Sequence, residues 1–251
     1  MMKAPTKQRN NENALAVERR LMKEAMARLE RIEPGYSSLH AVGRLIFGLD
    51  LTGSREQGLG RARIATAGMF DTVKNIGAIA VKLGYYRGID ECRISDWYDD
   101  YEALGRSMAQ LNCESGNTQI AKFLRLTQTE EQQLSGVVFI GDHCEDNRSE
   151  LRDLARSFGL KSIPLFIFHE CQDHDERSLK AKPIFKQMAA LSGGVYVEFK
   201  PDSGAVLNEL LADIASFSAG GSNTLESKSL PKTTEGRLLR SRLLLGLGKN
   251  Q

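Results

Sequence analysis

The sequence predicts an α/β fold with three layers, in which a doubly wound, mainly parallel β-sheet is covered by helices on both faces. Short apolar runs alternate along the chain with longer segments of helical periodicity, which is the order expected of βαβ units. Except for the short gap at 87–91, the segments between successive apolar runs are long enough to hold a helix, as right-handed crossovers between parallel strands require.

The apolar runs mark the expected strands, and the segments between them mark the expected helices. We expect strands at 44–50, 79–86, 92–95, 136–141, 163–168 and 195–199. We expect helices at 11–33, 59–76, 99–111, 118–130, 149–158, 183–191 and 204–216. The run at 136–141 is the clearest strand, because it is apolar throughout and ends in an acidic loop.

Composition divides the chain into three parts. Residues 1–38 are expected to be an N-terminal extension with an amphipathic helix, residues 39–217 the α/β domain, and residues 218–251 a linker with a basic amphipathic tail. Small and polar residues dominate 218–231, which is typical of a flexible linker.

The tail beyond the linker, EGRLLRSRLLLGLG at 235–248, is too short to be a stable helix alone and cannot bury its own leucines. We expect it to be a second contact that docks on a partner protein. Folding back onto the domain and lying on a membrane surface are the alternatives.

Composition and charge narrow the class of protein. The hydrophobic fraction of 41% and the charged fraction of 26% are those of a soluble globular protein. No apolar run is long enough to span a membrane and no secretory signal is visible, so a cytoplasmic location is expected. Four widely spaced cysteines are expected to be free thiols. The basic residues gather at the two ends and leave residues 36–217 acidic, which argues against nucleic-acid binding.

Oxygen-bearing side chains follow two of the expected strands. Asp50, Thr52 and Ser54 come directly after the first strand, and Asp142 follows the strand at 136–141. Between them, Thr118 lies in a Gly-containing loop ahead of a helix. Ligands of open parallel sheets bind at the carboxyl ends of the strands, and carboxylates with hydroxyls suit a hard cation such as Mg²⁺.

This pattern, D-x-T-x-S at 50–54 followed by Thr118 and Asp142, resembles the metal-ion-dependent adhesion site (MIDAS) of von Willebrand factor A (VWA) domains. The resemblance covers residues 45–216, roughly two thirds of the chain. It implies a Rossmann-like sheet of order 3-2-1-4-5-6, with the strands that precede Asp50 and Asp142 side by side. It also implies that Thr52 or Ser54, together with Thr118, binds Mg²⁺ or Mn²⁺ through a hydroxyl. Asp50 and Asp142 are then expected to bind the ion directly or through a water molecule.

The sequence departs from the family pattern in two places. His143 stands where the family usually has Gly, so that the loop at 142–146 is acidic and crowded. The middle loop has Ser115 and Gly116 in place of the common paired glycines.

The resemblance implies a Mg²⁺-dependent protein–protein interaction module, in which a partner protein supplies an acidic side chain to the metal. Intracellular bacterial members of the family often serve in multi-protein assemblies, so an adaptor or subunit role is expected. No nucleophile paired with a base is evident, and we expect no enzymatic activity. A metal-dependent hydrolase of a phosphate substrate, with His143 as its base, is the main alternative, and a structural subunit with a vestigial metal site is another.

A second cluster of metal-ligand residue types lies near two strand ends: His143, Cys144, His169, Cys171 and His174. Their spacing is tighter than that of most zinc sites. We expect them to be exposed polar groups of loops, with a zinc site as the alternative.

Overall fold

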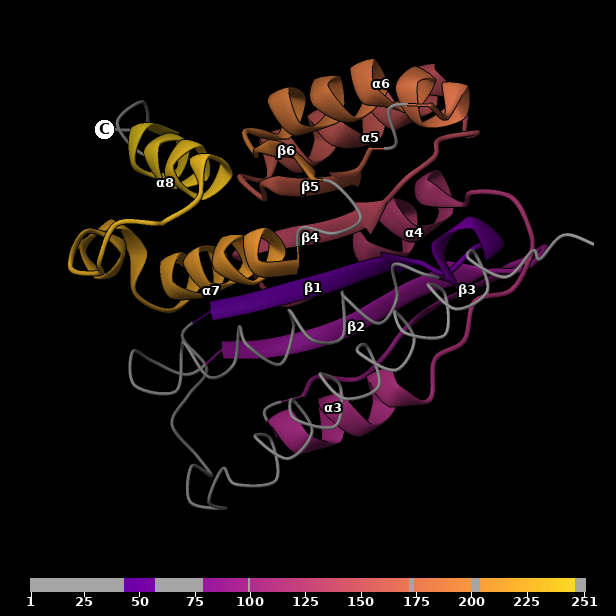
Figure 1. The fold of residues 1–251 in the computed structure, drawn as a ribbon. Helices are drawn as coiled ribbons and strands as arrows, with labels where there is room; N and C mark the ends of the chain where they lie inside the picture. The colour runs from indigo at the N-terminus through magenta and orange to yellow at the C-terminus, as the bar shows by residue number, and fades with distance from the viewer. Residues whose placement is uncertain (1–42, 57–78, 99, 172–173, 200–203, 247–251) are drawn as a thin grey trace, which may run out of the picture.

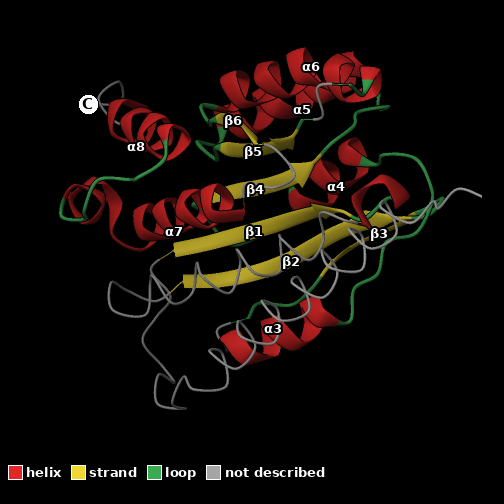
Figure 2. Cartoon of the chain, viewed as in Figure 1, coloured by secondary structure: helices red, strands yellow, loops and turns green. Residues whose placement is uncertain are grey.

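The computed structural model describes residues 43–56, 79–98, 100–171, 174–199 and 204–246 (Figures 1 and 2). They contain one six-stranded sheet of order β3-β2-β1-β4-β5-β6. Its strands are β1 Gly43–Asp50, β2 Ile79–Arg87, β3 Glu91–Ile94, β4 Gly136–Gly141, β5 Leu165–Glu170 and β6 Tyr196–Phe199. Every neighbouring pair is parallel except β2 and β3. The predictions of a doubly wound, mainly parallel sheet and of its order 3-2-1-4-5-6 are confirmed.

The described helices follow the expected alternation with the strands. They are the 3₁₀ turn η1 Gly53–Arg55, α3 Tyr101–Ala109, α4 Ile120–Thr127, α5 Arg148–Leu160, α6 Glu176–Ser192, α7 Gly204–Glu226 and α8 Thr234–Gly246. The helices expected at 11–33 and 59–76 lie outside the described residues.

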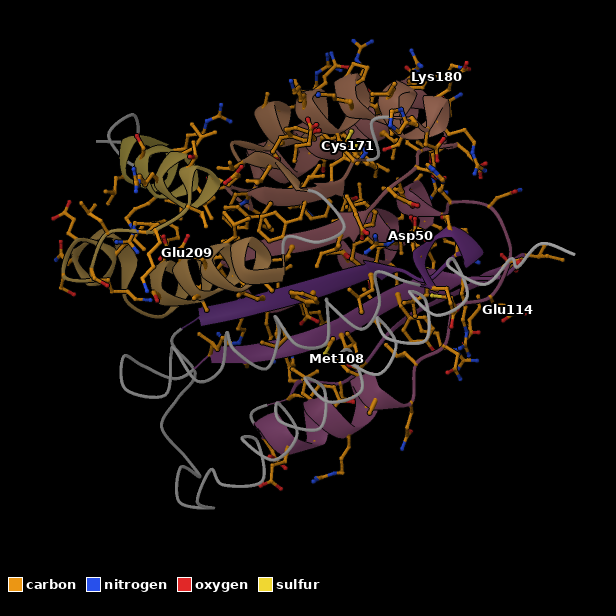
Figure 3. The ribbon with its side chains drawn as sticks, viewed as in Figure 1. Asp50, Met108, Glu114, Cys171, Lys180 and Glu209 are labelled. Atoms are coloured by element: carbon orange, nitrogen blue, oxygen red, sulfur yellow. The ribbon has the colours of Figure 1, made fainter. Side chains whose placement is uncertain are left out.

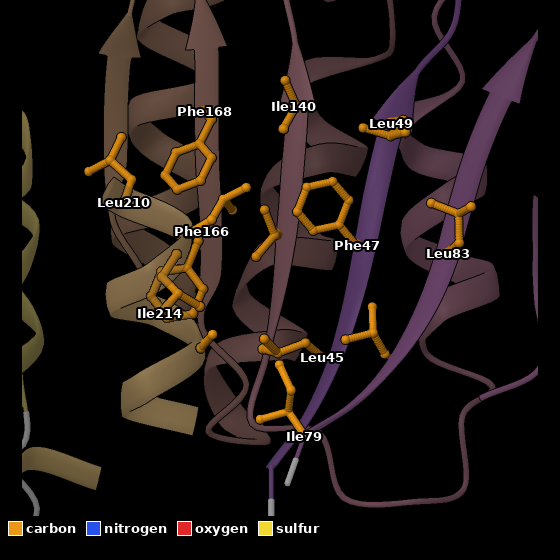
Figure 4. Packing of buried hydrophobic residues seen from close by; sticks show 14 of the residues in the cluster. Leu45, Phe47, Leu49, Ile79, Leu83, Ile140, Phe166, Phe168, Leu210 and Ile214 are labelled. Carbon is orange, nitrogen blue, oxygen red and sulfur yellow. The ribbon is translucent and has the colours of Figure 1, made fainter. Parts of the chain in front are cut away.

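Alternating side chains of the strands divide the core into two layers. Leu45, Phe47 and Leu49 of β1 belong to the core cluster that α3 and α7 cover, and Leu210 and Ile214 of α7 lie beside Phe168 and Phe166 of β5 (Figure 4). The opposite face of the sheet carries a separate apolar cluster, to which Ile46 belongs. Helices α4, α5 and α6 cover that face through Phe123, Phe158, Phe185 and Met188. Burial on both faces explains why the central strands read as continuous apolar runs.

Helix α6 begins seven residues earlier than expected. Asp175 caps it by accepting a hydrogen bond from the backbone N–H of Arg177 at 2.9 Å, and Pro183 lies inside the helix. The sequence prediction placed Pro183 at the start of this helix, a position in which proline is common. The better start signal is the run of Asp175 and Glu176, which provides a cap and an acidic first turn.

The expectation of a linker and a detached tail at 218–251 is wrong for the described residues 218–246. Helix α7 continues through Ser218 to Glu226, and α8 packs back on the domain (Figure 1). Leu225, Leu239 and Leu243 are buried members of the same core cluster as β1. The tail is therefore part of the described domain, and the expected docking of these leucines on a partner protein is corrected to folding back.

A buried ion pair fastens α8 to α7. Both oxygens of the Asp213 carboxylate accept from Arg240, with Nε donating to Oδ2 at 2.9 Å and Nη2 donating to Oδ1 at 2.5 Å. Arg240 Nη1 also donates to the carbonyl of Ser229 at 2.6 Å. A bidentate guanidinium–carboxylate pair fixes both distance and orientation, so it sets the register between the two helices.

Two expectations from composition can be compared with the described residues. The four cysteines, Cys92, Cys113, Cys144 and Cys171, are all free. No helix in the described part of the chain is both long and apolar enough to cross a membrane.

Packing of α8 predicts unequal effects of two neighbouring leucines. Leu239 is fully buried, whereas Leu238 is 45% exposed. Leu239→Ala should lower the free energy of unfolding by about 2–5 kcal/mol, because it leaves a cavity in the core. Leu238→Ala is the matched control and should cost less than about 0.5 kcal/mol. Equal effects of the two variants in urea titrations would contradict the packing of α8 described above.

Candidate metal site

Asp50 lies at the carboxyl end of β1, in the middle of the sheet (Figure 3). Its Oδ1 accepts hydrogen bonds from the backbone N–H of Thr52 at 2.8 Å and from Thr52 Oγ1 at 2.7 Å. The Thr52 hydroxyl is in turn 3.3 Å from Ser54 Oγ. The residues that the sequence grouped as D-x-T-x-S therefore form one compact cluster of oxygen atoms.

Asp142 follows β4, the strand that pairs with β1 on the side away from β2. Its side chain is 1% exposed, and neither carboxylate oxygen has a hydrogen-bond partner among the described residues. A buried carboxylate without a partner is costly, and cations or hydrogen-bond donors normally compensate such a group. The described residues thus leave the two acceptor oxygens of Asp142 without compensation.

The pKa of Asp50 is raised by its surroundings. Burial, the larger cause, and the negative charge of Asp142 raise the pKa of Asp50 to about 6. Hydrogen bonds from Thr52 and the positive charge of Arg55 oppose this shift but do not cancel it. Asp50 and Asp142 therefore bring together more negative charge than the described residues around them neutralise, which is the electrostatic condition for binding a cation.

Thr118 lies in a loop that contacts the cluster, because the backbone N–H of Glu114 donates to the carbonyl of Leu51 at 2.9 Å. Its hydroxyl has other partners, however. Thr118 Oγ1 donates to Asp146 Oδ2 at 2.7 Å and accepts from the backbone N–H of Glu145 at 2.8 Å. The fold brings the loop of Thr118 to the same edge of the sheet as Asp50, while its hydroxyl is paired with the loop after Asp142.

Two residues of this region were missed by the sequence prediction. Tyr86, fully buried at the end of β2, donates from its hydroxyl to Asp50 Oδ2 at 2.9 Å. Burial and the nearby charges of Asp50 and Asp146 raise its pKa well above the ordinary value, so Tyr86 remains a donor at neutral pH. Asp146 caps α4 by accepting from the backbone N–H groups of Ile120 and Ala121 at 3.1 and 2.9 Å.

A buried ion pair links the turn after β1 to the end of β5. Arg55, in η1, donates to the carboxylate of Glu170 at the end of β5, and each residue is only 3% exposed. The guanidinium that lies near Asp50 is thus already paired with an acidic group. It cannot by itself balance both Asp50 and Asp142.

His143 and His169 are buried, so the expectation that they are exposed in loops is wrong, whereas His174 is exposed as expected. His169 Nε2 lies 3.0 Å from the backbone carbonyl of Asp142 and 3.0 Å from Ser178 Oγ, and its Nδ1 lies 2.8 Å from Tyr196 Oη. Burial lowers the pKa of His169 to about 4, so the ring is neutral. Cys171 is also buried, and Cys144 is half-buried.

His143 makes a separate contact, with Nε2 2.6 Å from Asp175 Oδ2. The histidines therefore have different partners and do not converge with Cys144 and Cys171. Within the described ranges, no three His, Cys, Asp or Glu side chains are grouped as a metal site, and the zinc alternative has no support there.

Comparison with known proteins finds similarity in the fold and none in the sequence. No protein family model matches the chain, and no curated protein matches its sequence. The structure is similar to that of a von Willebrand factor type A protein from Catenulispora acidiphila, with a TM-score of 0.55 and 13% identity over 70% of this chain and 43% of that one.

Two further solved structures are similar to it. One is the SpRpn10 VWA domain, with a TM-score of 0.51 and 14% identity over 72% of this chain and 98% of that one. The other is the pilus adhesin SpaC from Lactobacillus rhamnosus GG, with a TM-score of 0.58 and 11% identity over 72% of this chain and 31% of that one. The chain thus spans less than half the length of the Catenulispora protein and of the adhesin. Together, the strand order and these similarities show that the chain has a von Willebrand factor A fold.

Proposed function

We propose that this chain is a metal-dependent protein-interaction module. In this proposal Asp50, Thr52, Ser54, Thr118 and Asp142 form a MIDAS that binds Mg²⁺, which Mn²⁺ can replace, and the bound ion attracts an acidic side chain of a partner protein. The observation that carries the proposal is the Asp142 carboxylate, buried with both oxygens unpartnered beside a second carboxylate. An adaptor or subunit role in a cytoplasmic multi-protein assembly is part of the same proposal.

The residues present fit a hard cation. Asp142 offers two oxygens without competing hydrogen bonds, and the hydroxyls of Thr52 and Ser54 lie beside Asp50. Thr118 would have to turn its hydroxyl from Asp146 to contribute. When bound, a divalent cation supplies charge attraction for a further carboxylate, because Mg²⁺ sites commonly keep positions open to water or ligand.

The burial and pairing of His143 favour a binding function over catalysis. His143, the base of the hydrolase alternative, is 4% exposed and engaged by Asp175. A general base must reach the proton that it removes within hydrogen-bond distance or through one water. A buried and engaged imidazole meets this requirement poorly. The proposal is therefore a binding site.

Replacing Asp142 by Asn tests the proposed site. Because its oxygens accept no hydrogen bond from the described residues, Asp142→Asn removes a charge without breaking a bond. We expect calorimetry to show that Mg²⁺ binding is lost, while the melting temperature without metal is unchanged or higher. In the wild type, Mg²⁺ at 100 times its Kd should stabilise the fold by about 2.7 kcal/mol.

The exposed carboxylate of Asp153 provides the matched control, since Asp153→Asn removes one negative charge from the surface of α5. This variant should bind Mg²⁺ as the wild type does. Unchanged Mg²⁺ binding in Asp142→Asn would show that the ion binds elsewhere and would refute the site.

The raised pKa of Asp50 predicts how metal stabilisation depends on pH. Its folded-state pKa of about 6 lies above the ordinary value of 3.8, so the ionised carboxylate costs stability without metal, and this cost grows as pH rises through that window. Metal binds the ionised form and competes with the proton. We expect the Mg²⁺-induced rise in melting temperature to be full at about pH 7.5 and to shrink as pH falls below about 6. A rise that is independent of pH between these values would contradict the role of Asp50.

Activity assays distinguish the proposal from the hydrolase alternative. The full chain with Mg²⁺ or Mn²⁺ should not hydrolyse phosphate monoesters or nucleotides above the rate of a metal blank. Metal-dependent turnover that disappears in both Asp142→Asn and His143→Gln would establish the hydrolase instead.

A further inference from the structure

We propose that this chain associates head to tail with further copies of itself, through a basic surface of α8 that docks into an acidic cavity beside α4 of the next copy. This inference goes beyond the proposed metal site and does not depend on it. Two surfaces of complementary charge, on opposite sides of the domain, carry the inference.

The basic surface is the solvent-exposed side of α8 and of the loop before it. Leu238 and Arg242 lie one helical turn apart, and Arg237 is exposed beside them. Leu230 and Lys232 extend this surface from the loop, where Leu230 is 80% exposed. These five residues form a basic stripe in which cations alternate with leucines.

Hydrogen bonds hold the loop part of the basic stripe against the helices. Arg237 Nε donates to the carbonyl of Pro231 at 3.0 Å, and its Nη2 donates to the carbonyl of Lys232 at 3.1 Å. The carboxylate of Glu209 in α7 accepts from the backbone N–H groups of Lys232 and Thr233 at 2.6 and 2.9 Å. The stripe is therefore preorganised, so docking would lose little conformational entropy of the loop.

The positive charge of the basic stripe is not neutralised within the described residues. A neighbouring arginine, Arg240, is buried and pairs with Asp213. In contrast, no ion pair between described residues joins Lys232, Arg237 or Arg242 to a carboxylate. A surface that complements the stripe must offer both apolar and acidic side chains.

A cavity between the sheet and the carboxyl end of α4 meets this requirement. Its volume of about 410 Å³ lies within the range of sites that hold an organic group, about 300–1,000 Å³. The apolar part of its wall consists of Ile46, Ile94 and Leu126, and the acidic part of Asp96, Glu130 and Glu131. We call it the acidic cavity.

Lys82 already places one cation in the wall of the acidic cavity. Its Nζ lies 2.6 Å from Glu130 Oε2 and 5.1 Å from the centre of the Trp97 ring. Lys82 neutralises Glu130, whereas Asp96 and Glu131 form no ion pair within the described ranges. The carbonyl end of α4 adds negative potential at the same place. The acidic cavity therefore keeps a net negative charge that the basic stripe complements.

The stripe and the cavity of one chain lie too far apart to meet. Helix α8 contacts β6 and buries Leu239 and Leu243 in the core cluster that α7 covers. The cavity is lined by Lys82 of β2 and Ile94 of β3, on the face that α4 covers. Because β6 and β3 are the two ends of the sheet, contact requires a second copy (Figure 1). Two different surfaces then meet, so the interface is heterologous and can continue from copy to copy.

Sedimentation velocity of the full chain in EDTA tests the inference without any contribution from the metal site. One stripe and one cavity bury less than the roughly 1,200–2,000 Å² of a stable complex, so association should be weak. We expect the average sedimentation coefficient to rise between roughly 10 µM and 1 mM protein. The rise should be smaller in 1 M than in 0.1 M NaCl, because the Debye length falls from about 10 Å to about 3 Å.

Two charge reversals test the two surfaces separately. Arg242→Glu alters the stripe and Glu131→Lys alters the cavity, and each should weaken self-association by about tenfold or more, because like charges would then face each other. An equimolar mixture of the two variants should form one-to-one dimers and nothing larger, since each variant supplies one intact surface. Lys180→Glu on α6 and Asp153→Lys on α5 are matched controls at exposed positions and should associate as the wild type does.

All the altered residues are exposed, so the melting temperatures should stay close to that of the wild type. If either charge reversal unfolds the chain, Lys232→Glu or Asp96→Lys tests the same surface. A wild type that stays monomeric throughout the concentration range would overturn the inference. Association that persists in both single variants, or that is absent from their mixture, would overturn it as well.

Vesicle flotation tests the other surface that could bind cations and leucines together. Vesicles of phosphatidylcholine with about 30% phosphatidylserine should not bind the wild type. Binding that is lost in Arg242→Glu, in a chain that does not self-associate, would assign the basic stripe to a membrane surface and refute docking on a second copy.

Discussion

The pairing of β1 with both β2 and β4 determines the chemistry of this molecule. In that register Asp50 lies opposite Tyr86 of β2, and the residue after Gly141 of β4 is Asp142. A Cβ added to Gly141 would lie 3.5 Å from the Cβ of Asp50, so the two strand ends approach closely. The central position of β1 thus creates both the donor for Asp50 and its repulsion by Asp142.

The strands and the two carboxylates of the candidate site could be predicted from sequence. The residues that contact these carboxylates and the neighbouring loop could not. An apolar run that ends in a carboxylate is visible along the chain. Tyr86 and Asp146 belong to no motif, and their roles depend on strand register and on the approach of a loop to α4. The register between β1 and β2, once the strand order is known, is the signal that would have identified Tyr86. His143 was visible as a departure, but only the structure shows its contact with Asp175.

The end of the chain shows how packing overrides local preference. Gly, Ser and Asn at 220–223 disfavour a helix interior, and the sequence prediction placed a linker there. Helix α7 nevertheless continues, since Leu225 enters the core and Lys228 Nζ donates to Ser216 Oγ at 2.7 Å. The leucines of α8 complete the same apolar layer. Because these leucines are buried, the neighbouring Arg240 also lies inside the domain, where it pairs with Asp213 of α7.

Charge balance connects the fold to the proposed function. Arg55 lies near Asp50, but its guanidinium is shared with Glu170, and the pKa of Asp50 remains raised despite it. Arg55 therefore does not balance the charge of the two buried carboxylates. Under the proposed function, a divalent cation would supply the positive charge that they lack. A monovalent ion would leave Asp50 and Asp142 with a net negative charge, and an acidic side chain of a partner would then be repelled. The proposed attraction of a partner's carboxylate thus requires a divalent ion with at least one coordination position open.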